Sequence, residues 1–134
     1  MAASKYDFGI EQGASYKLTI RYKDDEDNVI PLTDYCARLS WKTNTGSSQS
    51  FYSTDPANSN YKFYIDEPNG LIYIMFSANF TNSFLFSSAK YDLELKSPED
   101  LYTEGGKYTI RLLYGTINVV KRFSQNTDLM DCTT

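Results

Sequence analysis

The chain has 134 residues and a mass of 15.3 kDa, which allows one domain with one hydrophobic core. Its 41% hydrophobic content excludes a disordered polymer, and its 12 Tyr and 8 Phe favour β structure. The net charge of −4 argues against a nucleic-acid partner, no apolar run approaches the roughly 20 residues that cross a bilayer, and the absence of histidine removes the usual general base.

The N-terminal half alternates apolar and polar residues with the period of two that is typical of half-buried strands. Residues 16–23 and 35–42 each predict a strand, separated by a loop that contains the acidic run DDEDN at 24–28. The N-terminus shows no signal-peptide pattern, which predicts a protein made in a cytoplasm and used or assembled there. The side chains expected to face the core are Tyr16, Leu18, Ile20, Tyr22, Tyr35, Ala37, Leu39 and Trp41.

Turn-forming residues dominate 43–60, which predicts a long connection with a short edge strand around Phe51 and Tyr52. A strand at 61–65 and a turn at 67–70 follow.

Residues 71–77, LIYIMFS, are apolar on both faces of the predicted strand. This pattern is typical of a central strand that is covered on each side or that lies against a partner. We therefore take Ile72, Ile74 and Phe76 as a candidate partner interface.

The C-terminal half adds one helical turn and two strands. At 78–88 the spacing of Phe80, Phe84 and Leu85 predicts a single helical turn with these side chains on one side. A strand at 91–97 and a loop at 98–106 follow, and Gly115 suggests a bulge or bend inside a last strand at 107–123.

These elements predict an all-β, immunoglobulin-like antiparallel β-sandwich of about seven strands with at most one short helical turn. The sandwich occupies 1–123 as a single domain, and 124–134 form a polar C-terminal tail. Cys36 and Cys132 are expected to be free thiols, because two distant cysteines without a signal peptide are seldom bridged.

Asp92 and Glu94 are the most suggestive pair of carboxylates. They lie on one face of a strand about 7 Å apart, and paired carboxylates at such separations hydrolyse glycosidic bonds. Their alternation with Tyr91, Leu93 and Leu95 is explained more simply by a strand whose outer side faces solvent or a partner. We therefore add Asp92 and Glu94 to the candidate partner interface and assign no catalytic residue.

Other motifs bring no cofactor or metal. The run at 24–28 suggests calcium, but Val29 and Tyr35 stand where a calcium-binding EF-hand loop needs Gly and Glu. The aromatic content leaves open a glycan-binding face, although core packing accounts for most of these side chains. We expect no small-molecule ligand.

The order of these elements resembles small immunoglobulin-like β-sandwich structural proteins of tailed phages and prophages, over residues 8–123. The strand YDLEL at 91–95 matches that family's signature strand, and the departures are the insertion 43–60 and the loop 98–106. The other matching residues are Gly13, Leu18, Ile20, Tyr22, Asp27, Ile30, Leu32, Thr33, Tyr35, Ala37, Arg38, Arg111, Leu112, Leu113, Gly115, Ile117 and Val119.

The resemblance implies a virion location after assembly in the host cytoplasm, and a non-enzymatic structural role in the tail, the baseplate or the fibre-attachment region of a bacteriophage. Its implied partners are other virion structural proteins and copies of the same chain. A capsid decoration protein and a receptor- or glycan-binding module are the alternatives.

Overall fold

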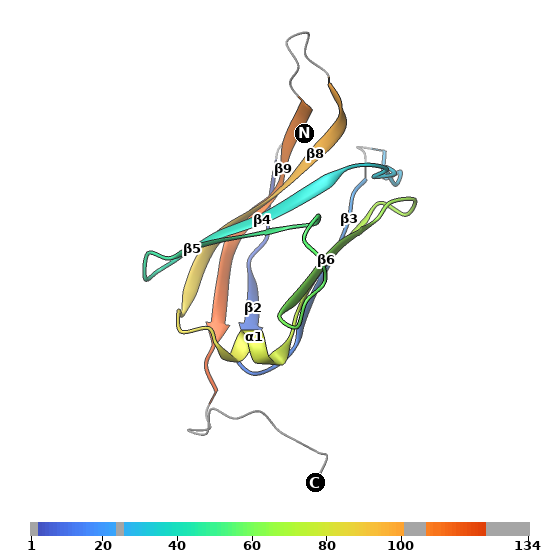
Figure 1. The fold of residues 1–134 in the computed structure, drawn as a ribbon. Coiled ribbons are helices and arrows are strands. Elements are labelled where there is room, and N and C mark those ends of the chain that lie inside the picture. Colours follow the sequence, from blue (N-terminus) through green and yellow to red (C-terminus); the bar gives the residue numbers. More distant parts are fainter. Residues whose placement is uncertain (1–2, 24–25, 101–106, 123–134) are drawn as a thin grey trace.

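The computed structural model describes residues 3–23, 26–100 and 107–122, which form two packed β-sheets with one short helix (Figure 1). The all-β sandwich predicted from the sequence is confirmed, with nine strands in the described residues where about seven were expected. The elements are β1 (Ser4–Lys5), β2 (Phe8–Glu11), β3 (Tyr16–Arg21), β4 (Cys36–Thr43), β5 (Ser48–Tyr52), β6 (Tyr61–Asp66), β7 (Leu71–Phe76), α1 (Ala78–Asn82), β8 (Ser88–Asp100) and β9 (Lys107–Val120).

The strand order is that of an immunoglobulin-type sandwich. The larger sheet has the order β1-β9-β8-β4-β5, with β2 also paired to β9, and the smaller sheet has the order β3-β7-β6. Strands β9, β8, β4 and β5 correspond to strands G, F, C and C′ of that fold, and β3, β7 and β6 correspond to strands B, E and D in the facing sheet. The predicted edge strand around Phe51 and Tyr52 is present as β5, and the expected tail 124–134 lies outside the described residues.

The core lies between the two sheets and follows the predicted alternation. At one end of the core, the other aromatic rings pack around Trp41 of β4. The centroid of the Trp41 ring lies 4.8 Å from that of Phe51, 5.8 Å from that of Phe76 and 5.7 Å from that of Phe84. Burying each such side chain stabilises the fold by about 1.5–3 kcal/mol. The aromatic-rich composition is therefore used largely in packing the sheets together.

The short helix α1 closes this end of the sandwich. The Ser77 hydroxyl caps it by accepting a hydrogen bond from the Phe80 N–H at 3.2 Å. Phe80 and Phe84 lie on one side, as predicted, and both pack against the core with ring centroids 4.9 Å apart. The expectation for Leu85 is wrong, since its side chain is 87% exposed. The helix ends at Asn82, so helical spacing no longer governs where Leu85 points.

The N-terminal strands β1 and β2 were not predicted, and both pair in parallel with β9. Between them the chain crosses Gly115, where an added Cβ would lie 2.3 Å from the Tyr6 carbonyl oxygen. The bulge expected at Gly115 lies instead at Leu112, because Leu93 pairs with Leu113 while the next residue pairs with Arg111. Gly115 serves a close approach of two backbones and not a bend.

Candidate functional site

Ile72, Ile74 and Phe76, predicted as a partner interface, are core residues. Their side chains are 0%, 1% and 2% exposed, and they face the larger sheet. That expectation is wrong, because β7 is covered on one face and these three side chains point to the covered face. The surface that β7 offers to a partner is the opposite one, with Leu71, Tyr73 and Met75 half-buried.

Asp92 and Glu94 lie on the outer face of the larger sheet, while Tyr91 is buried on its inner face, as the alternation predicted. Glu94 Oε1 accepts a hydrogen bond from the Arg38 guanidinium at 2.5 Å, and Asp92 Oδ2 lies 4.0 Å from Arg111 Nε. Hydrogen bonding to Glu94 raises the pKa of Arg38. The two carboxylates line different surface hollows, of about 310 and 300 Å³, so they do not converge on one site.

The outer face of the smaller sheet carries cations and apolar side chains in three cross-strand rows. Sequence reasoning missed this surface. We call it the lysine–tyrosine face. Its rows, read across β3, β7 and β6, are Lys17, Met75 and Lys62; then Thr19, Tyr73 and Tyr64; then Arg21, Leu71 and Asp66.

Two stacked tyrosines form the centre of the lysine–tyrosine face. The rings of Tyr64 and Tyr73 lie 4.8 Å apart between centroids at an angle of 22°. Lys17 Nζ lies 4.9 Å from the Tyr73 centroid, and Lys62 Nζ lies 4.7 Å from the Tyr64 centroid. The neighbouring strands therefore place a tyrosine on one side of Tyr73 and an ammonium group on the other. The two rings therefore contact each other and one ammonium group each, while Tyr64 keeps 36% of its surface exposed.

The charge of this face is opposite to that of the whole chain. It holds Lys17, Arg21 and Lys62 against a single carboxylate, Asp66, on a protein with a net charge of −4. Among the described residues, none of the three cations forms an ion pair with a carboxylate. The face therefore presents a local positive potential above half-buried apolar side chains.

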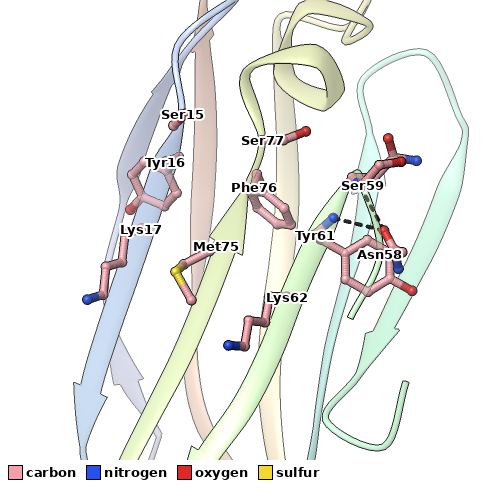
Figure 2. Close-up of a pocket in the computed structure, with 11 residues that line it drawn as sticks. Ser15, Tyr16, Lys17, Asn58, Ser59, Tyr61, Lys62, Met75, Phe76 and Ser77 are labelled. Carbon is pink, nitrogen blue, oxygen red and sulfur yellow. Dashed lines mark hydrogen bonds between the residues drawn. The ribbon is translucent and has the colours of Figure 1, made fainter. Parts of the chain in front are cut away.

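A shallow groove of about 360 Å³ begins where this face meets the end of the sandwich (Figure 2). Figure 2 shows Lys17, Met75 and Lys62 side by side at one end of it. Asn58 forms part of its far wall, where Asn58 Oδ1 accepts hydrogen bonds from the N–H groups of Asn60 at 2.8 Å and Tyr61 at 3.0 Å. These bonds give the groove a hydrogen-bonded rim beside two ammonium groups.

The shifted tyrosine pKa values have structural causes. Burial raises the pKa of Tyr16 to about 12, and burial followed by the charge of Asp7 raises the pKa of Tyr91. The Tyr91 hydroxyl donates a hydrogen bond to the Tyr6 carbonyl oxygen, which ties the N-terminal segment to β8. Burial, and then a hydrogen bond to Asp55, raises the pKa of Tyr61. Each of these tyrosines contacts another segment of the chain: Tyr16 stacks on Phe8, Tyr61 bonds Asp55 and Tyr91 bonds Tyr6.

The described residues contain no cluster of three or more His, Cys, Asp or Glu side chains with the geometry of a metal site. The acidic run 24–28 lies partly outside them, since residues 24 and 25 are not described. Cys36 is a half-buried free thiol, and Cys132 lies beyond the described residues. Within 3–23, 26–100 and 107–122, no helix is both long and apolar enough to span a membrane.

No protein-family model matches this chain, and a comparison with curated proteins found no matching sequence.

Proposed function

We propose that the protein is a non-enzymatic structural subunit of a tailed-phage virion, in the tail, the baseplate or the fibre-attachment region. The sequence resemblance supports this role, since its signature strand YDLEL forms the middle of β8 in the sandwich. The observation that carries the proposal is the lysine–tyrosine face, where half-buried apolar side chains lie beneath three cations. Protein interfaces combine a more apolar centre, often with aromatic and Met side chains, with a polar rim.

The chemistry of this face favours a neighbouring subunit with an acidic contact surface. Lys17 and Lys62 flank Met75, so a carboxylate from the partner would meet an ammonium group on either side of an apolar contact. Exposed charge pairs are screened by salt, so this contact weakens as ionic strength rises. Met75 and the stacked tyrosines supply the apolar area that a lasting contact needs.

A capsid decoration protein would use the same contact chemistry at a different virion position, and it remains the first alternative. A glycan-binding module is less well supported, because Tyr64 and Tyr73 stack on each other and each also contacts a lysine ammonium group, which leaves less ring surface for a sugar. A hydrolase using Asp92 and Glu94 is disfavoured, because each carboxylate lines a separate hollow beside an arginine.

Immunogold labelling of purified particles, with antibodies against the recombinant chain, tests the location. We expect gold at the tail or baseplate. Gold on the capsid would support the decoration alternative, and particles without label would refute the virion role.

Charge reversal tests the contact surface. We expect the double variant Lys17→Glu, Lys62→Glu to fold normally, by circular dichroism and thermal unfolding, and to enter particles about tenfold less than wild type. The control is Lys42→Glu with Lys90→Glu, an equal charge change on exposed residues of the opposite face. Equal incorporation of both variants would contradict the role of the lysine–tyrosine face.

A further inference from the structure

Strand β5 is an open edge of the larger sheet. It pairs with β4, and its sequence SQSFY contains no Lys, Arg, Asp, Glu or Pro. Charged side chains and proline on edge strands normally protect them against pairing with another chain. Of the edge strands in the described sheets, β5 is therefore the least protected. Each of the other edge strands, β1, β2, β3 and β6, carries at least one charged side chain: Lys5, Glu11, Lys17 and Lys62 respectively.

The hydrogen bonds to β4 show which backbone groups of β5 point inward. The Thr43 N–H donates to the Ser47 carbonyl at 2.7 Å, and the Ser53 N–H donates to the Ala37 carbonyl at 2.9 Å. Both β5-side residues are odd-numbered. Since antiparallel strands alternate the direction of their backbone groups, the even-numbered residues point their N–H and C=O groups at the open edge.

The backbone N–H and C=O groups of three residues, Ser48, Ser50 and Tyr52, therefore point at the open edge. Tyr52 is already satisfied locally: its N–H donates to Asp55 Oδ2 at 3.0 Å, and its carbonyl accepts from the Asp55 N–H at 3.0 Å. Ser48 and Ser50 are exposed, and their two N–H and two C=O groups are directed at the open edge.

We propose that β5 pairs antiparallel with β5 of a second copy of this chain, about a two-fold axis at Gln49. This register sets Ser48 of one copy opposite Ser50 of the other, so all four groups of each copy take part in hydrogen bonds across the axis. An axis at Ser50 would instead oppose Ser48 to Tyr52, whose backbone groups are taken. For a second copy, the available donors and acceptors therefore select this register.

The surface beside the axis supports a second copy as the occupant. Gln49 is exposed although it shares the inward side of β5 with buried Phe51. It lines a groove of about 460 Å³ together with Trp41, Phe84 and the exposed Leu85. In this register Gln49 of the second copy lies beside this groove, opposite Gln49 of the first copy, and shields apolar surface there. The inference deepens the proposed function by naming one contact and its partner.

Sedimentation of the purified chain tests the pairing independently of any virion. We expect reversible dimerisation over roughly 1–500 µM, since a contact of this size is weak. Ser50→Pro removes an N–H that points away from β4, a position where edge strands tolerate proline. It should leave the fold intact and abolish dimerisation, whereas Ser50→Ala keeps the N–H and should dimerise like wild type.

The register has its own test at Gln49, which would lie opposite itself across the axis. Gln49→Lys and Gln49→Glu should each weaken self-association about fivefold through like charges, and an equimolar mixture should restore it. A wild-type chain that stays monomeric, or mixing without effect, overturns this proposal and leaves the virion role standing. Immunogold labelling that finds no virion location would do the reverse.

Discussion

Replacing Gly115 with alanine should detach the N-terminal segment from β9. The added Cβ would lie 2.3 Å from the Tyr6 carbonyl oxygen and 2.7 Å from Asp7 Oδ1. Real Cβ atoms do not approach backbone this closely, and the Tyr6 carbonyl cannot rotate away as a side chain can. The segment that joins β1 to β2 must therefore move as a unit.

The cost follows from the hydrogen bonds that this movement breaks. The Tyr6 N–H donates to the Tyr114 carbonyl at 2.8 Å, the Thr116 N–H donates to Asp7 Oδ1 at 2.8 Å, and the Tyr91 hydroxyl donates to the Tyr6 carbonyl. Each contributes about 1 kcal/mol. Alanine also restricts the unfolded chain, which offsets roughly 0.5 kcal/mol of this loss. We expect the free energy of unfolding to fall by about 2.5 kcal/mol.

Urea unfolding followed by the fluorescence of Trp41, the single tryptophan, measures this change. Gly9→Ala is the matched control, because its added Cβ would meet the Asn118 carbonyl oxygen at 3.6 Å, an ordinary contact. A loss for Gly115→Ala no larger than that for Gly9→Ala would refute the steric argument.

A double-mutant cycle with Tyr91→Phe tests whether the segment has moved. Tyr91→Phe should cost about 1 kcal/mol in the wild-type chain, because it removes the bond to the Tyr6 carbonyl. It should cost almost nothing once Gly115→Ala has displaced that carbonyl. Additive losses would contradict displacement of the N-terminal segment.

Two further predictions concern the core. Phe84→Ala should lower the free energy of unfolding by about 3–5 kcal/mol in urea titrations, whereas Leu85→Ser should leave it nearly unchanged at concentrations where the chain is monomeric, because Leu85 is 87% exposed; equal losses would contradict the placement of these side chains. The pKa of Tyr16 is raised to about 12 from an ordinary value of 10, so the folded state holds this proton more tightly. The stability that the protonated Tyr16 contributes should be complete below pH 10 and should disappear between pH 10 and 12. The melting temperature of Tyr16→Phe should therefore fall less steeply with pH than that of wild type over that interval.

The register of β8 could be predicted because its two faces differ in polarity. Tyr91, Leu93 and Leu95 alternate with Asp92 and Glu94, and a period of two leaves one way to bury the apolar set. The same alternation placed the inward residues of β3 and β4 correctly. Asp92 and Glu94, two of the five candidate contact residues, were therefore assigned to the right face.

The orientation of β7 could not be predicted, because both of its faces are apolar. Ile72 and Tyr73 are equally compatible with a core position when the strand is considered alone. The pairing decides: Ile72 lies opposite Ile20 and Ile65, and Tyr73 lies opposite Thr19 and Tyr64. The polar side of β3 was visible in the sequence, but the register of β3 with β7 depends on residues 50 to 60 positions away.

The parallel pairing of β1 and β2 with β9 also escaped prediction for a non-local reason. β1 has two residues and β2 has four, too few to show a period. Gly115 carried a signal, since a glycine inside a strand marks a close backbone approach as well as a bulge. Choosing between these readings required knowing that Tyr6 crosses β9 at that point.

The two proposed contacts are compatible in one assembly. The β5 edge belongs to the larger sheet, and the lysine–tyrosine face is the outer surface of the smaller one. A two-fold axis between antiparallel edge strands runs perpendicular to the sheet, so both smaller sheets of the proposed dimer lie on the same side of the joined larger sheets. Both lysine–tyrosine faces then point to that side. A virion surface with regularly repeated acidic sites would engage the two faces together, and the second contact would form at a high effective concentration. Ser50→Pro should therefore reduce incorporation into particles even though residue 50 lies outside the lysine–tyrosine face.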